Sequence, residues 1–215
     1  MISDQFEDAG ERRQLMVTSQ LEARRIRDPQ VLAAMRRVPR HAFVPSEHRD
    51  EAYADSPLPI GEDQTISQPY IVALMTEMLG LRTDLRVLEV GTGSGYQTAV
   101  LAEIVREIFT VEARVVLFDN ARRCLGQLDY RNIQFRHGNG CDGWPEFAPF
   151  DRIIVTACAE IMPQALIDQI GSEGRMVLPV GGTDGDQRIE IVDRRPDGRI
   201  DIQEGIPVRF VMMTS

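Results

Sequence analysis

A glycine-rich stretch carries the clearest chemical signal in this sequence. Val87–Val90 is a short apolar segment, Gly91-Thr92-Gly93-Ser94-Gly95 follows directly, and Tyr96–Val105 has the pattern of a helix. Glycines allow a sharp turn and a close approach of a ligand to the backbone, and the first turn of a helix offers free N–H groups. Glu112 ends the next apolar segment, at the distance from the glycines where an acidic residue accepts hydrogen bonds from a ribose. The order of these features predicts a nucleoside-binding site.

The spacing of the glycines separates two classes of nucleoside ligand. A dinucleotide site usually has the pattern G-x-G-x-x-G, and its helix N-terminus holds a pyrophosphate. This chain has G-x-G-x-G, with Glu89 just before it. That tighter pattern resembles the fingerprint of class I methyltransferases. The resemblance implies S-adenosylmethionine as the ligand and leaves a NAD-dependent oxidoreductase as a distant alternative.

The elements that must position this site change in character near residue 80. Before it, the sequence has the patterns of helices and loops, among them a helix over Glu11–Ile26 and one that begins at Asp28-Pro29, with no convincing strand. From Arg86 onward, apolar segments alternate with helical ones, which indicates a mainly parallel sheet covered on both faces. The expected strands are Val87–Val90, Ile108–Val111, Ile133–Phe135, Arg152–Val155 and Arg175–Val180.

The C-terminal segments indicate antiparallel strands, because the turn Pro196-Asp197-Gly198 joins two apolar segments. A last strand is expected over Val208–Met212. We therefore expect a doubly wound, Rossmann-like α/β fold, mostly parallel with an antiparallel C-terminal part. Residues 1–215 are expected to form a single domain, with a helical cap over 1–80 and the ligand-binding core over 81–215.

Composition excludes several classes of function. The net charge is −9, which argues against a nucleic-acid partner, and all 24 basic residues are arginines, which excludes lysine chemistry. The three cysteines are widely spaced and the three histidines lack metal-ligand spacing, so we expect neither disulfides nor a metal site. No apolar run reaches the roughly 20 residues that span a bilayer, and the acidic N-terminal stretch does not resemble a signal peptide. These features favour a cytoplasmic protein without a membrane partner and give no indication of oligomeric state.

Several further segments resemble the protein-L-isoaspartate O-methyltransferase family. Together with the glycine loop they extend over residues 12–211 and comprise Val38–Pro45, Ala52–Asp55, Pro57–Gly61, Gln64–Pro69, Gly95–Ala102, Thr110–Glu112, Asp142–Trp144 and Met176–Gly181. The segment Thr65-Ile66-Ser67-Gln68-Pro69 is rare in other methyltransferases. The resemblance implies methyl transfer from S-adenosylmethionine to the α-carboxylate of isoaspartyl residues in damaged proteins and peptides, which starts their repair through a succinimide.

The resemblance places the family's catalytic serine on Ser67. A carboxylate has a pKa near ~4 and is already an anionic nucleophile at neutral pH, so the enzyme must mainly align it with the methyl and sulfur atoms and remove its water. A hydroxyl that hydrogen-bonds the carboxylate would serve this purpose. The alternative role of Ser67 is to cap the helix that begins at Pro69.

The resemblance also implies the residues around the cofactor, and two of its positions depart from the family pattern. The expected cofactor-binding residues are Gln64, Thr65, Ile66, Gly91, Thr92, Gly93, Gly95, Glu112, Asn139 and Gly140. Asn139 stands where the family usually has aspartate, and its amide oxygen can accept the same hydrogen bond from adenine without a charge. Phe210-Val211-Met212-Met213 replaces the usual F-V-P-L in a region expected to form the peptide cleft. These departures keep two alternatives open: a carboxyl methyltransferase with a different peptide substrate, and a non-catalytic S-adenosylmethionine-binding protein.

Overall fold

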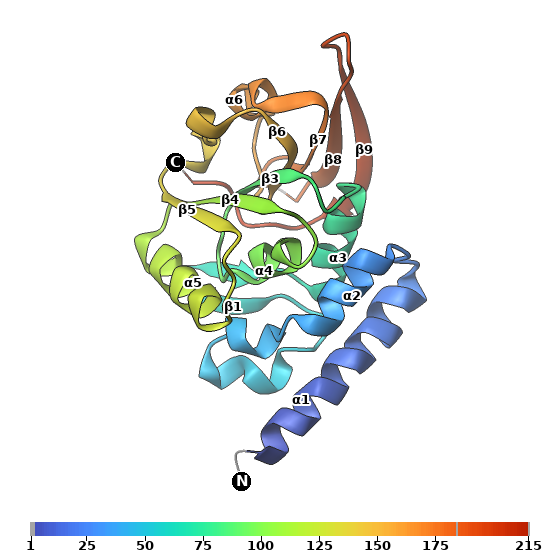
Figure 1. Cartoon of the computed structure of the whole chain (residues 1–215), viewed down its shortest axis with the longest axis vertical. Helices are drawn as coiled ribbons and strands as arrows, with labels where there is room; N and C mark the ends of the chain where they lie inside the picture. Colours follow the sequence, from blue (N-terminus) through green and yellow to red (C-terminus); the bar gives the residue numbers. More distant parts are fainter. Residues whose placement is uncertain (1–2, 184, 215) are drawn as a thin grey trace.

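The core of the computed structural model, which describes residues 3–183 and 185–214, is a seven-stranded sheet (Figure 1). Its strands are β3 (Arg86–Val90), β4 (Glu107–Glu112), β5 (Ile133–His137), β6 (Phe150–Val155), β7 (Ile170–Val180), β8 (Gln187–Arg194) and β9 (Ile200–Val208). They lie in the order β5-β4-β3-β6-β7-β8-β9. Pairing is parallel from β5 to β7 and antiparallel from β7 to β9. The predicted α/β fold with an antiparallel C-terminal part is confirmed.

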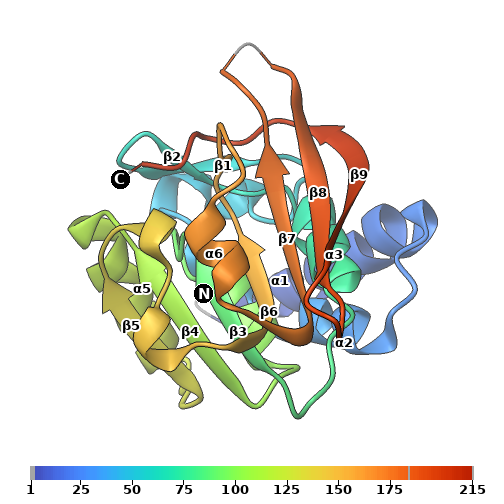
Figure 2. The ribbon, with the colours of Figure 1, turned by 90° about the horizontal axis from the view of Figure 1, so that it is seen from above.

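Helices cover both faces of this sheet. They are α1 (Ser3–Met16), α2 (Pro29–Arg37), α3 (Pro69–Met78), α4 (Tyr96–Ala102), α5 (Val115–Gln127) and α6 (Gln164–Asp168). Single turns of other helix types lie at Val17–Leu21, Glu22–Arg24, Arg40–Phe43, Ser46–Glu51, Gly140–Asp142 and Pro145–Phe147. Figure 2 shows α6 on one side of the sheet and α3 with the N-terminal helices on the other.

Alternation along the central strands divides the core into two apolar clusters. Ile154 of β6 and Val177 of β7 belong to the cluster that contains α2, α3, α4 and α5, whereas their neighbours Ile153 and Met176 belong to the cluster under α6. Successive side chains of a strand point to opposite faces, so a strand that is apolar at every position must be covered on both. This is why the continuous apolar segments of the sequence become central parallel strands.

Of the two N-terminal helices expected from the sequence, one begins where predicted and the other is interrupted. Asp28 caps α2 as expected, because its side chain accepts hydrogen bonds from the backbone N–H groups of Gln30 at 2.8 Å and Val31 at 3.2 Å. The helix expected over Glu11–Ile26 is instead interrupted: α1 ends at Met16 and passes into a π-helical turn and then a 3₁₀ turn. A π turn advances the register of a helix, and both Met16 and the adjacent Val17 become buried.

Two of the strand expectations are wrong. A β-hairpin of β1 (Leu58–Gly61) and β2 (Gln64–Ile66) lies in the region expected to lack strands. Its turn residues Glu62 and Asp63 have φ angles of 53° and 55°, the left-handed values of a tight hairpin turn, in residue types that rarely indicate one. At the other end, the strand expected over Val208–Met212 does not form. β9 ends at Val208, and beyond it only an isolated bridge joins Met212 to Cys158.

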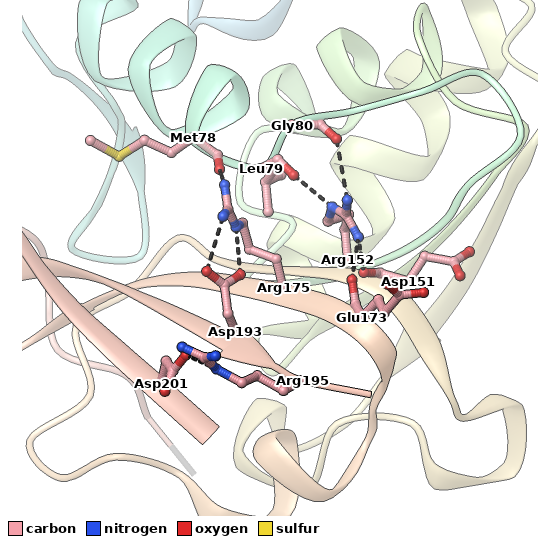
Figure 3. Close-up of polar contacts among 10 residues, drawn as sticks. All are labelled: Met78, Leu79, Gly80, Asp151, Arg152, Glu173, Arg175, Asp193, Arg195 and Asp201. Atoms are coloured by element: carbon pink, nitrogen blue, oxygen red, sulfur yellow. Dashed lines mark hydrogen bonds and ion pairs between the residues drawn. The ribbon is translucent and has the colours of Figure 1, made fainter. Parts of the chain in front are cut away.

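Two arginines of the sheet bind the C-terminal end of α3 (Figure 3). Arg175 of β7 donates to the carbonyl oxygen of Met78 at 2.8 Å, and Arg152 of β6 donates to that of Leu79 at 2.6 Å. Asp193 of β8 orients Arg175 through two hydrogen bonds of 2.7 and 2.9 Å. The last carbonyl groups of a helix have no partner within the helix, and cations stabilise them. The sheet therefore fixes α3, whose other end follows Ser67.

Candidate active site

The glycine loop follows β3 and places bare backbone on the wall of a cavity. Gly91 has a φ of 96°, and a Cβ atom at this position would lie 2.5 Å from Oγ1 of Thr156. The hydroxyl of Thr156 donates to the carbonyl oxygen of Gly91 at 2.5 Å, which ties the loop to the end of β6. Gly140 also has no room for a side chain, because its Cβ would lie 2.6 Å from Cγ1 of Val90. Glycine at these two positions therefore lets the backbone pack directly against Thr156 and Val90.

Glu112 at the end of β4 holds the glycine loop from the neighbouring strand. One carboxylate oxygen accepts a hydrogen bond from the N–H of Gly93 at 2.8 Å, and the other accepts from the N–H of Arg114 at 2.9 Å. Its side chain lines the cavity, although the residue is only 6% exposed. A carboxylate has about four acceptor positions, so both oxygens retain capacity for ribose hydroxyl groups.

A buried acid lies beneath the same loop. Glu89 is fully buried and accepts hydrogen bonds of 2.6 Å from the hydroxyls of Thr98 and Thr110 on one oxygen. Thr110 also shares a 2.6 Å hydrogen bond with Thr92 of the loop. Burial in the apolar interior raises the pKa of Glu89 to about 8, with the two threonine hydroxyls opposing the shift. Glu89 therefore supports the loop as a neutral group at pH 7 and does not contact the ligand space.

The loop cavity is the space bounded by the glycine loop, the hairpin strand β2, the start of α3 and the C-terminal segment, and it contains about 870 Å³ of empty space with its mouth. That volume suits a ligand of nucleoside size. Nine of the eleven residues expected to bind the cofactor or carry catalysis lie on its wall: Gln64, Thr65, Ile66, Ser67, Gly91, Thr92, Gly93, Glu112 and Gly140. The structure thus brings together residues that are far apart in the sequence.

Two expected cofactor residues lie outside the lining of the loop cavity. Gly95 precedes α4 with a φ of 87°, and a Cβ there would lie 3.0 Å from Cδ1 of Leu125, so its role is to let α4 pack closely on α5. Asn139 uses its side-chain oxygen to accept a hydrogen bond from the N–H of Cys141 at 2.9 Å. Its neighbour Gly140 is the residue on the wall. A contact of Asn139 with adenine stays a prediction.

Ser67 lies between the hairpin and α3 with its hydroxyl available. The N-cap of α3 is Gln68, and no side chain makes a capping hydrogen bond there. Within the described residues, the Ser67 hydroxyl has no hydrogen-bond partner, so it does not act as the helix cap. Gln68 instead donates to the side chain of Asp55 at 2.8 Å, and Arg24 pairs with the same aspartate. This network anchors the residue that directly follows Ser67.

A second cavity, the open cleft, meets the loop cavity at Ser67. Its lining comes from Pro57, the segment before α3, Thr156 and the segment Pro207–Val211. The residues that line both spaces are Thr65, Ser67, Ile71, Thr156, Phe210 and Val211. The junction therefore carries three hydroxyl groups. That of Thr156 is donated to the carbonyl oxygen of Gly91, which leaves those of Thr65 and Ser67 to orient an oxygen nucleophile between two ligands.

The sequence reasoning missed Thr156, and the structure places the methionine pair on the loop cavity. Thr156 follows β6, which pairs with β3, and ligands of such sheets bind beyond the carboxyl ends of adjacent strands, so this rule could have found it. Met212 and Met213 line the loop cavity and do not line the open cleft. The expectation that the departure from F-V-P-L falls on the peptide cleft stays a prediction. Phe210 and Val211, which agree with the family pattern, are the residues that line both.

Charges differ between the two spaces. Glu112 and Arg114 line the loop cavity, and Arg114 is paired with Glu62 at 3.8 Å. In the open cleft, Arg209 is the one charged residue among the lining residues of the described chain. Residues 3–183 and 185–214 contain no group of three or more histidine, cysteine or acidic side chains that could hold a metal ion. None of their helices is long and apolar enough to cross a membrane.

Comparison with known proteins identifies the family to which this chain belongs. The family model described as protein-L-isoaspartate(D-aspartate) O-methyltransferase matches residues 11–215. A protein-L-isoaspartate O-methyltransferase of Gloeobacter violaceus is 51% identical over 199 residues, which cover 93% of this chain and 97% of the relative. A protein-L-isoaspartate O-methyltransferase 1 of Rhodopseudomonas palustris is 49% identical over 210 residues, which cover 98% of this chain and 86% of the relative.

Solved structures agree with this assignment. A protein-L-isoaspartate O-methyltransferase superposes with a TM-score of 0.85 at 27% identity, over 94% of this chain and 66% of that one. A structure of a putative protein-L-isoaspartate O-methyltransferase of Plasmodium falciparum, in complex with S-adenosyl-L-homocysteine, superposes with a TM-score of 0.82 at 24% identity, over 94% and 98% of the two chains, and shows the same fold. On the family match over residues 11–215 and the identity of about half with its relatives, this chain belongs to the protein-L-isoaspartate(D-aspartate) O-methyltransferase family.

Proposed function

We propose that this protein transfers the methyl group of S-adenosylmethionine to the α-carboxylate of L-isoaspartyl residues in damaged proteins and peptides. The observation that carries the proposal is the junction of the two cavities at Ser67 and Thr156. One space is built around the glycine loop and Glu112, as a nucleoside ligand requires, and the other opens beside it for a peptide. A methyl donor and an acceptor held in these two spaces meet where the hydroxyl groups lie.

On the donor side, we assign the cofactor to the loop cavity. S-adenosylmethionine supplies a methyl group on a positively charged sulfur. The carboxylate of Glu112 accepts hydrogen bonds from the ribose, and the backbone of Gly91 and Gly93 lies against the cofactor without side chains in the way. Gln64, Thr65 and Ile66 of the hairpin strand close the space from the opposite side.

On the acceptor side, Ser67 hydrogen-bonds the isoaspartyl carboxylate and holds one oxygen in line with the methyl carbon. Among the described residues, the lining of the open cleft contains no histidine, aspartate or glutamate, and these residues offer no side-chain base there. None is needed, because a carboxylate with a pKa near ~4 is deprotonated at neutral pH. Alignment and removal of water from the carboxylate supply the rate acceleration.

The product of this reaction is a methyl ester, whose methoxy group can be displaced and released as methanol, whereas an ionised carboxylate has no group that can leave. The neighbouring backbone nitrogen can then attack the ester carbonyl and form a succinimide, and hydrolysis of the succinimide returns part of the material to a normal aspartyl linkage. The enzyme needs to bind only the isoaspartyl segment to start this series of reactions. Its expected partners are therefore proteins and peptides of many sequences.

We also place the protein in the cytoplasm as a single domain without nucleic-acid partners. Cys124, Cys141 and Cys158 are all free in the structure, which suits a reducing compartment. The net charge of −9 opposes binding to a phosphate backbone. Cell fractionation with an antibody against the protein tests the compartment.

The deciding experiment uses labelled S-adenosylmethionine and two peptides that differ only in aspartate or isoaspartate at one position. We expect base-labile label on the isoaspartyl peptide alone, which identifies a carboxyl methyl ester and its selectivity together. Label on neither peptide, in protein that binds S-adenosylhomocysteine, would contradict the proposal in favour of a binding protein or a different acceptor.

A further inference from the structure

The C-terminal strap, defined as residues Arg209–Thr214, is held in place by a side chain instead of by a strand. Gln187 at the start of β8 is 4% exposed and pairs with both backbone groups of Phe210. The N–H of Phe210 donates to its side-chain oxygen at 2.6 Å, and its side-chain nitrogen donates to the carbonyl oxygen of Phe210 at 3.2 Å. Farther along, Cys158 exchanges backbone hydrogen bonds of 2.8 Å with Val211 and Met213. The strap is therefore rigid where it passes the open cleft.

This rigid strap presents an uncompensated positive charge to the cleft. Arg209 is exposed, lines the open cleft and has no ion-pair partner among the described residues. It is the one charged residue of that lining, in a chain whose net charge is −9. A positive charge left unpaired on the wall of a binding cleft attracts anionic groups of the molecule that enters it.

The position of Arg209 separates this charge from the reacting carboxylate. Arg209 lines the open cleft but not the loop cavity, whereas Ser67 and Thr156 line both. The reacting carboxylate must lie at the junction, where the two spaces meet. The partner of Arg209 is therefore another part of the same peptide.

Resting on the proposed function, we infer that Arg209 determines specificity by selecting isoaspartyl peptides that carry a second carboxylate close to the isoaspartyl residue. A guanidinium group suits this task because its planar fork can bind both oxygens of a carboxylate. The charge is exposed, so the pairing is weak and salt screens it. An acidic residue in place of a neutral one should lower KM roughly two- to fivefold at low salt.

The test measures kcat and KM on two sets of isoaspartyl peptides at low and high salt. Within each set the peptides are identical except for glutamate, glutamine or lysine at one position, which lies before the isoaspartyl residue in one set and after it in the other. For the wild-type protein we expect KM to rise from glutamate to glutamine to lysine in at least one set, with kcat little changed. The difference should shrink at high salt.

Three variants distinguish the role of Arg209 from a general effect. Arg209→Gln should remove the dependence of KM on peptide charge, Arg209→Lys should retain most of it, and Arg209→Glu should reverse it. The matched control is Arg122→Gln, an exposed arginine of α5 that lies on neither cavity, which should behave as the wild type.

Two results would overturn the inference while leaving the proposed function standing. One is a wild-type protein that methylates all the peptides with the same KM. The other is an Arg209→Gln variant whose KM rises equally for all of them, because Arg209 would then bind the reacting carboxylate itself. Failure of the wild-type protein to methylate any isoaspartyl peptide would instead contradict the proposed function.

Discussion

At the scale of single residues, Ser67 combines a half-buried position with an unused hydroxyl group at the junction of the two cavities. Hydroxyl groups of this kind usually find a local partner, and serine before a helix usually caps it. Here Gln68 occupies the N-cap position and makes no capping bond. The hydroxyl of Ser67 is thus left for a ligand.

We expect Ser67→Ala to lower kcat on an isoaspartyl peptide roughly tenfold or more, the effect of losing one hydrogen bond to a charged group. The affinity for S-adenosylhomocysteine, measured by calorimetry, should change far less, because the backbone at this position is held by the Gln68–Asp55 hydrogen bond. Ser46→Ala, at an exposed serine that lines neither cavity, is the control. Loss of cofactor affinity with unchanged kcat would assign Ser67 to the cofactor instead.

Glu89 makes the stability of the protein depend on pH, because burial raises its pKa to about 8. The unfolded chain releases this proton near the ordinary value of 4.5, whereas the folded protein keeps it until about pH 8. Between these values the unfolded state binds fewer protons, so rising pH lowers the free energy of unfolding.

Glu89→Gln removes this titration and keeps an oxygen that can accept from Thr98 and Thr110. In urea unfolding, the variant should gain stability relative to the wild type as the pH rises from 5 to 8, by on the order of 1–3 kcal/mol. A stability difference that stays constant over this range would show that the carboxyl group of Glu89 is ionised throughout.

At the scale of elements, α3 links the sheet to the junction of the cavities. Its N-terminal end follows Ser67 and its C-terminal end is bound by Arg152 and Arg175 (Figure 3). Asp193 makes a bidentate pair with Arg175, so the helix is tied through one arginine to both β7 and β8. Loosening this end should therefore weaken the fold and disturb the position of Ser67.

Arg175→Met should lower the free energy of unfolding by about 1–3 kcal/mol, because it leaves the carboxylate of Asp193 and the carbonyl of Met78 without their partner. The measurement is guanidinium chloride unfolding, followed by kcat under native conditions. Arg195→Met is a suitable control, since Arg195 also pairs with an aspartate, Asp201, but on the exposed surface, where solvent screens the ion pair. Equal losses from the two variants would contradict a special role for the helix end.

At the scale of the whole molecule, the loop cavity joins segments from both ends of the chain. Its wall runs from Gln64 in the hairpin, through the glycine loop and Glu112, to Thr214 in the C-terminal strap. A ligand that contacts all of them must stabilise the folded state as one unit. By mass action, a ligand present at ~100 times its Kd contributes about 2.7 kcal/mol.

Saturating S-adenosylhomocysteine should raise the Tm by roughly 5–10 °C and slow amide hydrogen exchange in the hairpin and the strap together with the glycine loop. Gly91→Ala should abolish both effects, because its Cβ would lie 2.5 Å from Thr156, whereas Gly126→Ala on α5 has nothing within 4 Å and should retain them. Protection confined to the glycine loop would mean that the hairpin and the strap do not contact the ligand.

The sequence by itself determined the class of fold and the segment, from the glycine loop to Glu112, that lines the loop cavity. Apolar segments of strand length that alternate with helical ones can bury both faces only in a covered parallel sheet. The order of β3, glycine loop, α4, β4 and Glu112 is local along the chain, so its geometry follows from nearest neighbours. The same locality made the Asp28 cap of α2 predictable.

The tertiary structure alone decided the hairpin, the strap and the second cavity, because each depends on contacts between distant residues. The turn at Glu62-Asp63 adopts left-handed φ angles at both residues, which aspartate tolerates but glutamate does not favour, and the packing of the hairpin against the rest of the chain selects them. The strap leaves the sheet because Gln187 takes the place of a neighbouring strand at Phe210. For the same reason the sequence could not show that Thr156 and Arg209 share a cleft with Ser67. Local propensity does not specify which distant segments of the chain meet at the edge of the sheet.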